Sequence, residues 1–578
     1  MSIMDRPAVA SDASQRLIEN AAEGMLGPNP FIGFRPQDIT AAFRELAHQA
    51  VQHPAMVLEQ EAALLRELIA ILSGSSKLAA APGDRRFADA AWQDNPLYRI
   101  CLQTYLAWTN SVTQFVDQSV LDQRTKQRVR FAASLVTDAL APTNTLFGNP
   151  AALRRTLASG GANLLAGLKN MLADMATNGS MPSQVDKSAF KLGENLALSK
   201  GAVVLTTPVL ELIQYSPATD AVHARPHLIV PPQINKFYFF DLSPDRSIVE
   251  YLTQNRFQVF AISWRNPTAA ERDWDMQTYV AAIREAIETI TDITSSPDVI
   301  VHAACSGAMT ATILAAVLAA RREPLIHAMT LMVAVLGGNP DTQLGLFSTP
   351  EVIAAAKLET MRRGVLEGDE MSRVFAWMRP NDLIWSYWTN NYLMGNPPPA
   401  FDILYWNNDT TRLPAKFHST LIDIFANDCL LNPGQFKMLG VPVDVSQIAC
   451  DKFIVAGLTD HITPWRDGYR MARALGGNNE FVLSSGGHIQ TLINPVGGTK
   501  GKYFVNPTLV PRADDWLSQA KPVVGSWWEH WRAWLAERSG EVRAAPAQLG
   551  NDRYPRGGDA PGTYVSAGCA GACGRPGT

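Results

Sequence analysis

Three side chains that could carry out acyl transfer each follow a short apolar run. Cys305 follows the letters VIVHAA, Asp460 follows FIVAGLT, and His488 follows EFVLSSGG. A thiol can attack an acyl carbonyl when a histidine takes its proton, and a carboxylate can orient that histidine and stabilise its charged form. The three residues therefore make up a candidate nucleophile, acid and base for chemistry through a covalent thioester.

The segment around Cys305 has the features of a nucleophile turn between a strand and a helix. The small residues Ala303 and Gly307 stand two positions before and two positions after the cysteine, where they would let the strand and the helix approach closely. A position at the start of a helix favours the thiolate through the helix dipole. The alternative is a buried cysteine that ends a core strand, since cysteine is often buried.

Asp460 and His488 also have structural alternatives when each is taken alone. Asp460 could cap the helix that starts near Pro464, which is a frequent role for aspartate, and a single histidine is more often an ordinary loop or core residue. Together, however, the residues occur in the order nucleophile, acid, base, which is the order of α/β hydrolases. Each also follows a predicted strand at its carboxyl end, where open α/β sheets bind their ligands.

The elements that must position these residues begin after Gly201, where strand-like apolar runs alternate with helical segments. Alternation of this kind predicts a parallel sheet with helices on both faces, and strands covered on both faces are apolar throughout. We therefore predict an α/β-hydrolase fold, with a doubly wound, mostly parallel sheet. The predicted strands are 227–231, 258–263, 298–304, 329–335, 452–456 and 480–484, and the main predicted helices are 274–290 and 307–320.

The rest of the chain divides by composition. Residues 1–30 read as a flexible N-terminal arm, and residues 31–200 as an all-helical N-terminal domain with a first helix from Pro36 to Leu72. The catalytic domain is expected over 201–537, with an aromatic-rich helical cap or lid inserted at about 339–442. Such a cap would exclude water from a site at the sheet edge. Residues 538–578 are rich in Gly, Ala and Pro and predict an extended C-terminal tail.

Composition excludes several classes of protein. The chain of 578 residues is 47% hydrophobic and 18% charged, with a net charge of −4 and six cysteines. This balance argues against wholesale disorder and against a general nucleic-acid binder. Few cysteines in so long a chain favour a reduced, intracellular setting. We find neither a secretory signal nor an apolar run long enough to span a membrane.

Several long strings of residues resemble the polyhydroxyalkanoate synthases, and most closely the single-component, medium-chain-length (class II) kind. The resemblance covers nearly the whole chain. There are two departures. Ala303 and Ala308 replace glycines expected around the nucleophile, which bears on rate or substrate range, and residues 566–578 run on beyond PGTYV (561–565), which resembles the family terminus. The strings are PPQINKFY (231–238), SWRNP (263–267), RPNDL (379–383), YWNNDTTR (405–412), GLTDHI (457–462), SGGHI (485–489) and SWW (526–528).

The resemblance implies an acyltransferase that polymerises (R)-3-hydroxyacyl-CoA into polyester. It assigns the nucleophile to Cys305, the acid to Asp460 and the base to His488. The oxyanion would be bound by the backbone N–H of Ser306 and by an N–H near Ile234, in the loop after the first hydrolase strand. Coenzyme A is then a leaving group of the substrate, and no metal or other cofactor is implied. The alternative among enzymes is a thioesterase or another acyltransferase with the same cysteine nucleophile. The non-enzyme alternative is a granule-coating protein with a vestigial site, and an intact triad and a full hydrolase core argue against it.

The resemblance also implies partners and a location. Expected partners are 3-hydroxyacyl-CoA substrates and the growing polymer, with no nucleic acid and no membrane span, and a homodimer is compatible with the family. Because the polymer is apolar and insoluble, we expect a cytoplasmic protein associated with polymer granules.

Overall fold

The computed structural model describes residues 36–338, 350–498 and 501–566. The flexible arm predicted for residues 1–30 lies outside this range, as does the end of the predicted tail. The chain forms two compact units. Unit 1 contains residues up to Asp186 together with 370–400, and unit 2 contains 187–338, 350–369 and 401 onward. The insertion predicted at about 339–442 is therefore divided between the two units.

Unit 1 is helical over its described residues. A compact core forms around Phe87, Trp92, Leu102 and Tyr105. The single helix predicted from Pro36 to Leu72 is in fact two helices, because a residue that precedes proline avoids the helical conformation and His53 precedes Pro54. The main helices are α2 (Pro36–Gln52), α3 (Pro54–Leu72), α4 (Ala91–Asp94), α5 (Pro96–Gln118), α6 (Gln123–Ala139), α7 (Pro150–Ala158), α8 (Ala162–Thr177) and α14 (Gly368–Met378).

The segment 370–400 belongs to unit 1 through polar contacts with α8. The buried Asp174 carboxylate accepts a hydrogen bond of 2.7 Å from the Tyr392 hydroxyl. The Asn163 side chain donates to the carbonyl of Leu393 at 2.7 Å. Gly167 lies against the Tyr392 carbonyl so closely that a Cβ would meet it at 1.9 Å. Residues 370–400, which in sequence lie between two parts of unit 2, are thus part of the helical unit.

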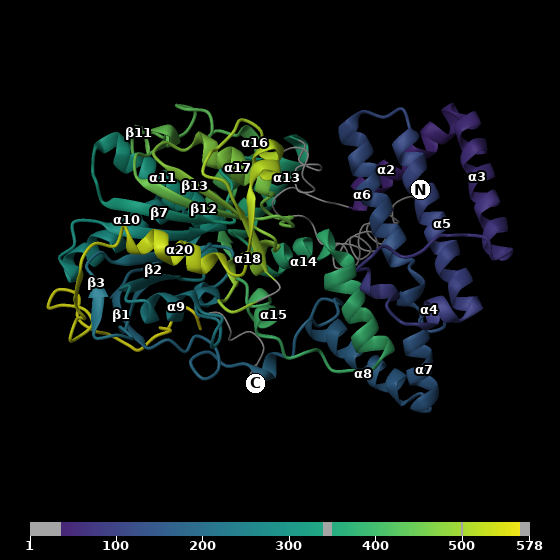
Figure 1. The fold of residues 1–578 in the computed structure, drawn as a ribbon, viewed down its shortest axis with the longest axis horizontal. Coiled ribbons are helices and arrows are strands. Elements are labelled where there is room, and N and C mark those ends of the chain that lie inside the picture. Colours follow the sequence, from purple (N-terminus) through teal and green to yellow (C-terminus); the bar gives the residue numbers. More distant parts are fainter. Residues whose placement is uncertain (1–35, 339–349, 499–500, 567–578) are drawn as a thin grey trace, which may run out of the picture. The chain divides into compact units, whose positions relative to one another are not determined.

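Unit 2 contains a ten-stranded sheet in the order β1-β2-β5-β4-β6-β7-β12-β13-β14-β15 (Figure 1). The six central strands, from β5 to β13, are parallel, and the strands on both flanks are antiparallel. The fold class predicted from the sequence is confirmed. The strands are β1 (Gly201–Thr206), β2 (Leu210–Tyr215), β4 (His227–Val230), β5 (Val259–Trp264), β6 (Val299–Ala304), β7 (Ile326–Met332), β12 (Asp451–Gly457), β13 (Asn479–Ser484), β14 (Lys502–Val505) and β15 (Lys521–Val524).

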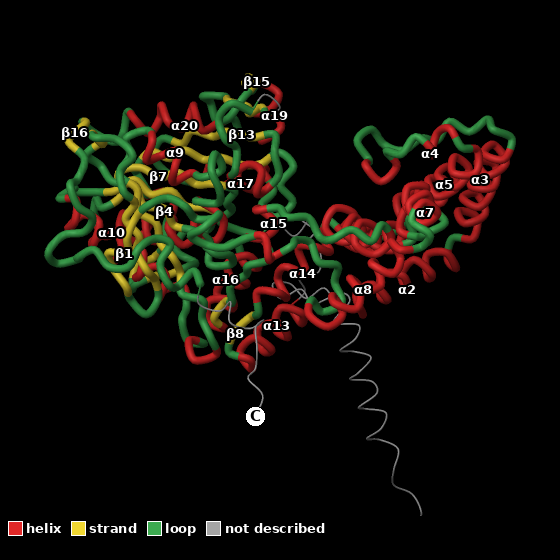
Figure 2. The backbone as a smooth tube through the Cα atoms, turned by 90° about the horizontal axis from the view of Figure 1, so that it is seen from below, coloured by secondary structure: helices red, strands yellow, loops and turns green. Residues whose placement is uncertain are grey.

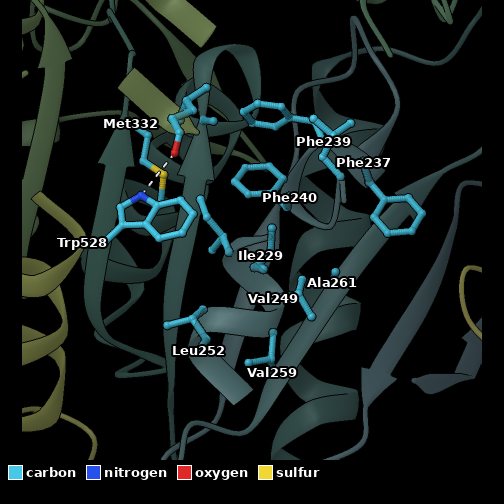
Figure 3. Close-up of a cluster of buried hydrophobic side chains, with 14 of the residues drawn as sticks. Ile229, Phe237, Phe239, Phe240, Val249, Leu252, Val259, Ala261, Met332 and Trp528 are labelled. Carbon is cyan, nitrogen blue, oxygen red and sulfur yellow. Dashed lines mark hydrogen bonds between the residues drawn. The ribbon is translucent and has the colours of Figure 1, made fainter. Parts of the chain in front are cut away.

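Helices cover both faces of the sheet (Figure 2). On one face, α9 (Ile248–Gln254) and α20 (Trp527–Ala536) enclose a large apolar cluster that includes Val259 and Phe453. Part of this cluster, with Trp528 beside Met332 and Ile229, appears in Figure 3. The other face packs against α10 (Met276–Thr294), α11 (Cys305–Arg321) and α17 (Trp465–Ala474). Of the described helices, none is both long and apolar enough to cross a membrane.

A chain of buried polar groups ties β6 to α20 inside the apolar cluster. The Trp531 indole donates to the Thr330 hydroxyl at 2.8 Å, and that hydroxyl lies 3.0 Å from Nδ1 of His302. His302 Nε2 lies 2.8 Å from Nδ1 of His227, whose Nε2 lies 3.0 Å from the Ser539 hydroxyl. Burial lowers the pKa of both histidines, so they remain neutral and fill the core with paired hydrogen bonds.

The chain after α20 runs back along the sheet. Strand β16 (Val542–Ala544) pairs with β3 (Ala221–His223). Farther on, Gly557 and Gly558 exchange backbone hydrogen bonds of 2.8 Å with Val203 of β1. The buried Glu211 carboxylate then accepts bonds from the backbone N–H groups of Thr563 and Tyr564. This segment covers the outer side of the edge strand β1.

Candidate active site

The turn between β6 and α11 is strained at Cys305. Ala304 has an extended backbone, whereas Cys305 has a φ of +49° and opens the helix directly. A positive φ is unusual for a residue with a side chain, and such strain clusters at functional sites. The turn lifts the partly exposed Cys305 thiol out of the strand, at the carboxyl edge of the parallel sheet. This is the geometry that the sequence around Cys305 predicts.

The small residues around Cys305 allow a close approach between α11 and the loop after β4. A Cβ on Gly307 would lie 2.5 Å from the carbonyl oxygen of Pro231 and 2.7 Å from that of Val230. These are backbone atoms with little room to move, so glycine is required there. Ala303 and Ala308, which replace glycines expected from the resemblance, are both fully buried. The two methyl groups therefore occupy space inside the core.

Asp460 and His488 form a tight buried pair. His488 Nδ1 lies 2.7 Å from Oδ2 of Asp460. The other carboxylate oxygen accepts bonds from the backbone N–H groups of Ile462 and Thr463, at 2.8 and 2.9 Å. The Thr463 hydroxyl donates to Asp460 Oδ2 at 2.7 Å. Asp460 thus caps the following turn and also holds the histidine, so the two alternative roles considered for it coexist.

The electrostatics of this pair favour a charged histidine. Burial opposes the positive charge on His488, but the Asp460 carboxylate and hydrogen bonds with Asp460 and Cys305 outweigh it, and raise the His488 pKa to about 10. Burial likewise opposes the charge on Asp460, yet His488 and Thr463 hold the pKa of that carboxyl below its usual value. The histidine is therefore a strong proton acceptor in hydrogen-bond contact with the Cys305 thiol.

A hydrogen bond links the loop that carries Ile234 to Ser306, so the segments of the two predicted oxyanion donors are in contact. The Gln233 N–H donates to the Ser306 hydroxyl at 3.1 Å, and the Gln233 amide reaches Thr310 of α11 at 3.2 Å. Ser306 belongs to the first turn of α11, whose N–H groups have no acceptor within the helix. Among the described residues, the Ile234 N–H has no hydrogen-bond acceptor either. Both N–H groups therefore remain candidate oxyanion donors.

Sequence reasoning missed two residues that build the site. Thr463 bonds to Asp460 and also to the Val333 carbonyl at 3.0 Å, which fixes the acid against β7. Thr411 bonds to the loop after β4. Thr411 has no local signature, because its partner is 178 positions away. Thr463 stands three positions after Asp460, but its other partner, Val333, is 130 positions away. The described residues contain no group of three His, Cys, Asp or Glu side chains that could hold a metal ion.

Fold and site together define an α/β hydrolase with a cysteine at the nucleophile position. In agreement, residues 226–495 match the family described as "alpha/beta hydrolase fold", and residues 83–252 match "Poly-beta-hydroxybutyrate polymerase (PhaC) N-terminus". The monoacylglycerol lipase of Paleococcus ferrophilus is 14% identical and aligns with 48% of this chain and 90% of its own, with a TM-score of 0.32.

Two relatives are much closer in sequence. Poly(3-hydroxyalkanoate) polymerase 1 of Ectopseudomonas oleovorans is 49% identical over 96% of this chain and 99% of its own length. Poly(3-hydroxyalkanoate) polymerase 2 of the same organism is 44% identical over 94% of this chain and 97% of its own length. The chain therefore belongs to the poly(3-hydroxyalkanoate) polymerase family of acyltransferases, and the resemblance noted from the sequence is confirmed.

The raised pKa of His488 predicts how the stability of the pair depends on pH. Because the folded-state pKa of His488 lies above the usual value of 6.5, the contribution of charged His488 to the free energy of unfolding is complete below about pH 6.5. It is lost as the pH rises toward 10. The lowered pKa of Asp460 adds a contribution that is lost as the pH falls below about 4. Asp460→Asn should reduce the free energy of unfolding by about 1–3 kcal/mol near pH 6, and the reduction should be smaller at pH 9.5.

Denaturant unfolding at the two pH values measures this difference. Asp402→Asn is a matched control, because Asp402 pairs with Arg246, which stays charged across the range. The reduction caused by the control should therefore change little between pH 6 and pH 9.5. An equal reduction at both pH values for Asp460→Asn would contradict the coupling to His488.

Proposed function

We propose that this chain polymerises (R)-3-hydroxyacyl-CoA of medium chain length into polyester and releases CoA, through a covalent thioester on Cys305. The observation that carries the proposal is the strained turn at Cys305, whose thiol meets the buried His488–Asp460 pair. Membership of the polymerase family supports the reaction type. The resemblance to the single-component kind supports the medium chain length.

In the first half-reaction, His488 takes the proton of the Cys305 thiol and the thiolate attacks the thioester carbonyl of the substrate. The resulting oxyanion is bound by the N–H groups of Ser306 and Ile234. When the tetrahedral intermediate collapses, the bond to the CoA sulfur breaks, and His488 returns the proton to CoA. Asp460 keeps the imidazole oriented and stabilises its positive charge. The acyl group is left on Cys305.

In the second half-reaction, the 3-hydroxyl of another hydroxyacyl-CoA loses its proton to His488 and attacks the Cys305 thioester. An ester forms, and the Cys305 sulfur leaves and regains a proton. The lengthened chain still carries CoA, which Cys305 displaces in the next cycle. Water would end the chain as a free acid, so the site has to exclude water. The Cys305 thiol and the His488 imidazole account for every bond change and proton transfer in these two half-reactions. We propose that no metal or redox cofactor takes part.

The nucleophile is tested by Cys305→Ala. The partly exposed thiol makes a small contribution to the core, so the variant should unfold within about 1 kcal/mol of the native protein. Polymer formation and CoA release should fall by at least about a thousandfold. CoA release from a ladder of 3-hydroxyacyl-CoA lengths, with mass analysis of the product, measures both turnover and chain-length preference. Cys101→Ala, which changes a cysteine of unit 1, is the control, and native turnover by Cys305→Ala would refute the proposal.

Asp460 and His488 should fail at different steps. A thiol loses its proton much more easily than a secondary hydroxyl, so acylation should tolerate loss of the acid better than elongation does. We expect Asp460→Asn to form a hydroxyacyl adduct on Cys305 and to elongate it very slowly, whereas His488→Gln should be impaired in adduct formation itself. Intact-protein mass spectrometry after brief exposure to 3-hydroxyacyl-CoA separates the two steps. Normal elongation by Asp460→Asn, or no adduct at all, would show this division to be wrong.

We further propose that the protein works in the cytoplasm at the surface of polymer granules, with unit 1 in contact with the polymer. Helix α8 supports this idea, because Leu165, Leu168, Leu172 and Met175 are all exposed and recur at the spacing of one helical face. The tryptophans of α20 are a poorer candidate, since Trp527, Trp528 and Trp531 are buried in the core. A homodimer is supported by the resemblance alone.

Fractionation of polymer-producing cells tests the location. The native protein should be recovered with the granules, and Leu165→Asp combined with Leu172→Asp should shift a large part of it to the soluble fraction. The same two changes should leave CoA release by the purified protein within about twofold, because both side chains are exposed. Ala173→Asp, which adds a charge at an exposed position of the same helix that is off the spacing of the apolar stripe, is the control. A native protein that is wholly soluble while polymer accumulates would contradict the proposal.

A further inference from the structure

The loop after β4 is held by the segment 405–412, which is distant in sequence. The Trp406 indole donates to the Lys236 carbonyl at 2.7 Å. The backbone N–H of Thr411 donates to the Ile234 carbonyl at 3.2 Å. The Thr411 hydroxyl donates to the Gln233 carbonyl at 2.6 Å. Three carbonyls of one short loop thus accept hydrogen bonds from the same segment.

The bond from the Thr411 hydroxyl determines the direction of one particular N–H group. The Gln233 carbonyl and the Ile234 N–H belong to the same peptide unit, and in a planar trans peptide they point in opposite directions. Because the carbonyl points to Thr411, the Ile234 N–H points away from the segment 405–412. Thr411 is itself buried, with 4% of its surface exposed, so water cannot readily replace its hydroxyl.

A buried ion pair anchors the segment that carries Thr411. The Asp409 carboxylate lies 2.7 Å from Nζ of Lys236, and the two side chains are 14% and 4% exposed. The other carboxylate oxygen accepts a bond of 2.9 Å from the hydroxyl of Tyr238, which is fully buried. Lys236 and Tyr238 lie at the end of the same loop. The segment 405–412 is therefore bound to the loop both by hydrogen bonds to backbone carbonyls and by side-chain contacts of Asp409.

We propose that Thr411 is a positioning residue for acyl transfer, which orients the Ile234 N–H toward the oxyanion, and that Asp409 supports it. The proposal rests on the proposed function, in which Ile234 is an oxyanion donor. Thr411 acts through the peptide plane and does not touch the substrate. Its removal should affect steps that pass through a tetrahedral oxyanion and should spare steps that do not.

Two reactions of the same thiol separate these cases. Acylation by 3-hydroxyacyl-CoA forms an oxyanion, whereas alkylation by iodoacetamide displaces iodide from a saturated carbon and forms none. Thr411→Val removes the hydroxyl while keeping the shape, and should slow acylation of Cys305 by at least about tenfold. Alkylation of Cys305, measured on its own peptide by mass spectrometry, should stay within about twofold. Thr411→Ser retains the hydroxyl and should acylate within about threefold of the native rate.

The controls distinguish this proposal from a general loss of structure. Thr289→Val changes a buried threonine whose hydroxyl bonds to the Glu285 carbonyl of its own helix, and it should leave both reactions unchanged. If Thr411→Val does not fold, Asp409→Asn is the second variant and should show the same split. Normal acylation by Thr411→Val, an equal loss of both reactions, or a serine variant no better than valine would overturn the proposal. An adduct elsewhere than on Cys305 in the native protein would instead overturn the proposed function.

Discussion

The positive φ at Cys305 is the constraint on which the arrangement of the site depends. A side chain is tolerated there only because the surrounding backbone leaves no alternative: β6 is paired on both sides within the sheet, and α11 starts at once. The turn brings Gly307 against the Pro231 carbonyl. The loop after β4 is thereby placed beside the first turn of α11. Nucleophile and candidate oxyanion donors thus depend on a single backbone contact.

The parts of the site that follow from strand order could be predicted from the sequence, and the parts that depend on distant contacts could not. Parallel strands bring their carboxyl ends to one edge, so residues after β6, β12 and β13 were expected to meet. Thr411 bonds to a residue 178 positions away, and no local pattern encodes that contact. Thr463 would have been read as an ordinary helix-start residue, since its role comes from its bonds to Asp460 and Val333.

The elements of the fold likewise include some that could be predicted from the sequence and some that could not. The apolar central strands were recognised with errors of a few residues, the largest at the strand predicted as 329–335, which runs from Ile326 to Met332. The flanking strands β1, β2, β14 and β15 were missed. β14 and β15 have only four residues each, and Glu211 and Gln214 interrupt the apolar run of β2. The aromatic segment before residue 400 looked like part of a cap, yet Tyr392 and Leu393 pack with α8 through Asp174 and Asn163. The position of this segment in the sequence does not show which of the two units it packs with.

The segment of Gly557 and Gly558, which pairs with β1, determines how the C-terminal end of the chain can be shortened or extended. An uncovered edge strand offers unpaired N–H and C=O groups to any neighbouring chain. Gly557 and Gly558 occupy those groups on Val203, while Glu211 retains the residues that follow. Shortening the protein ahead of Gly557 would therefore open a site for intermolecular β-pairing and aggregation. A fusion partner attached beyond Val565 would leave the edge closed.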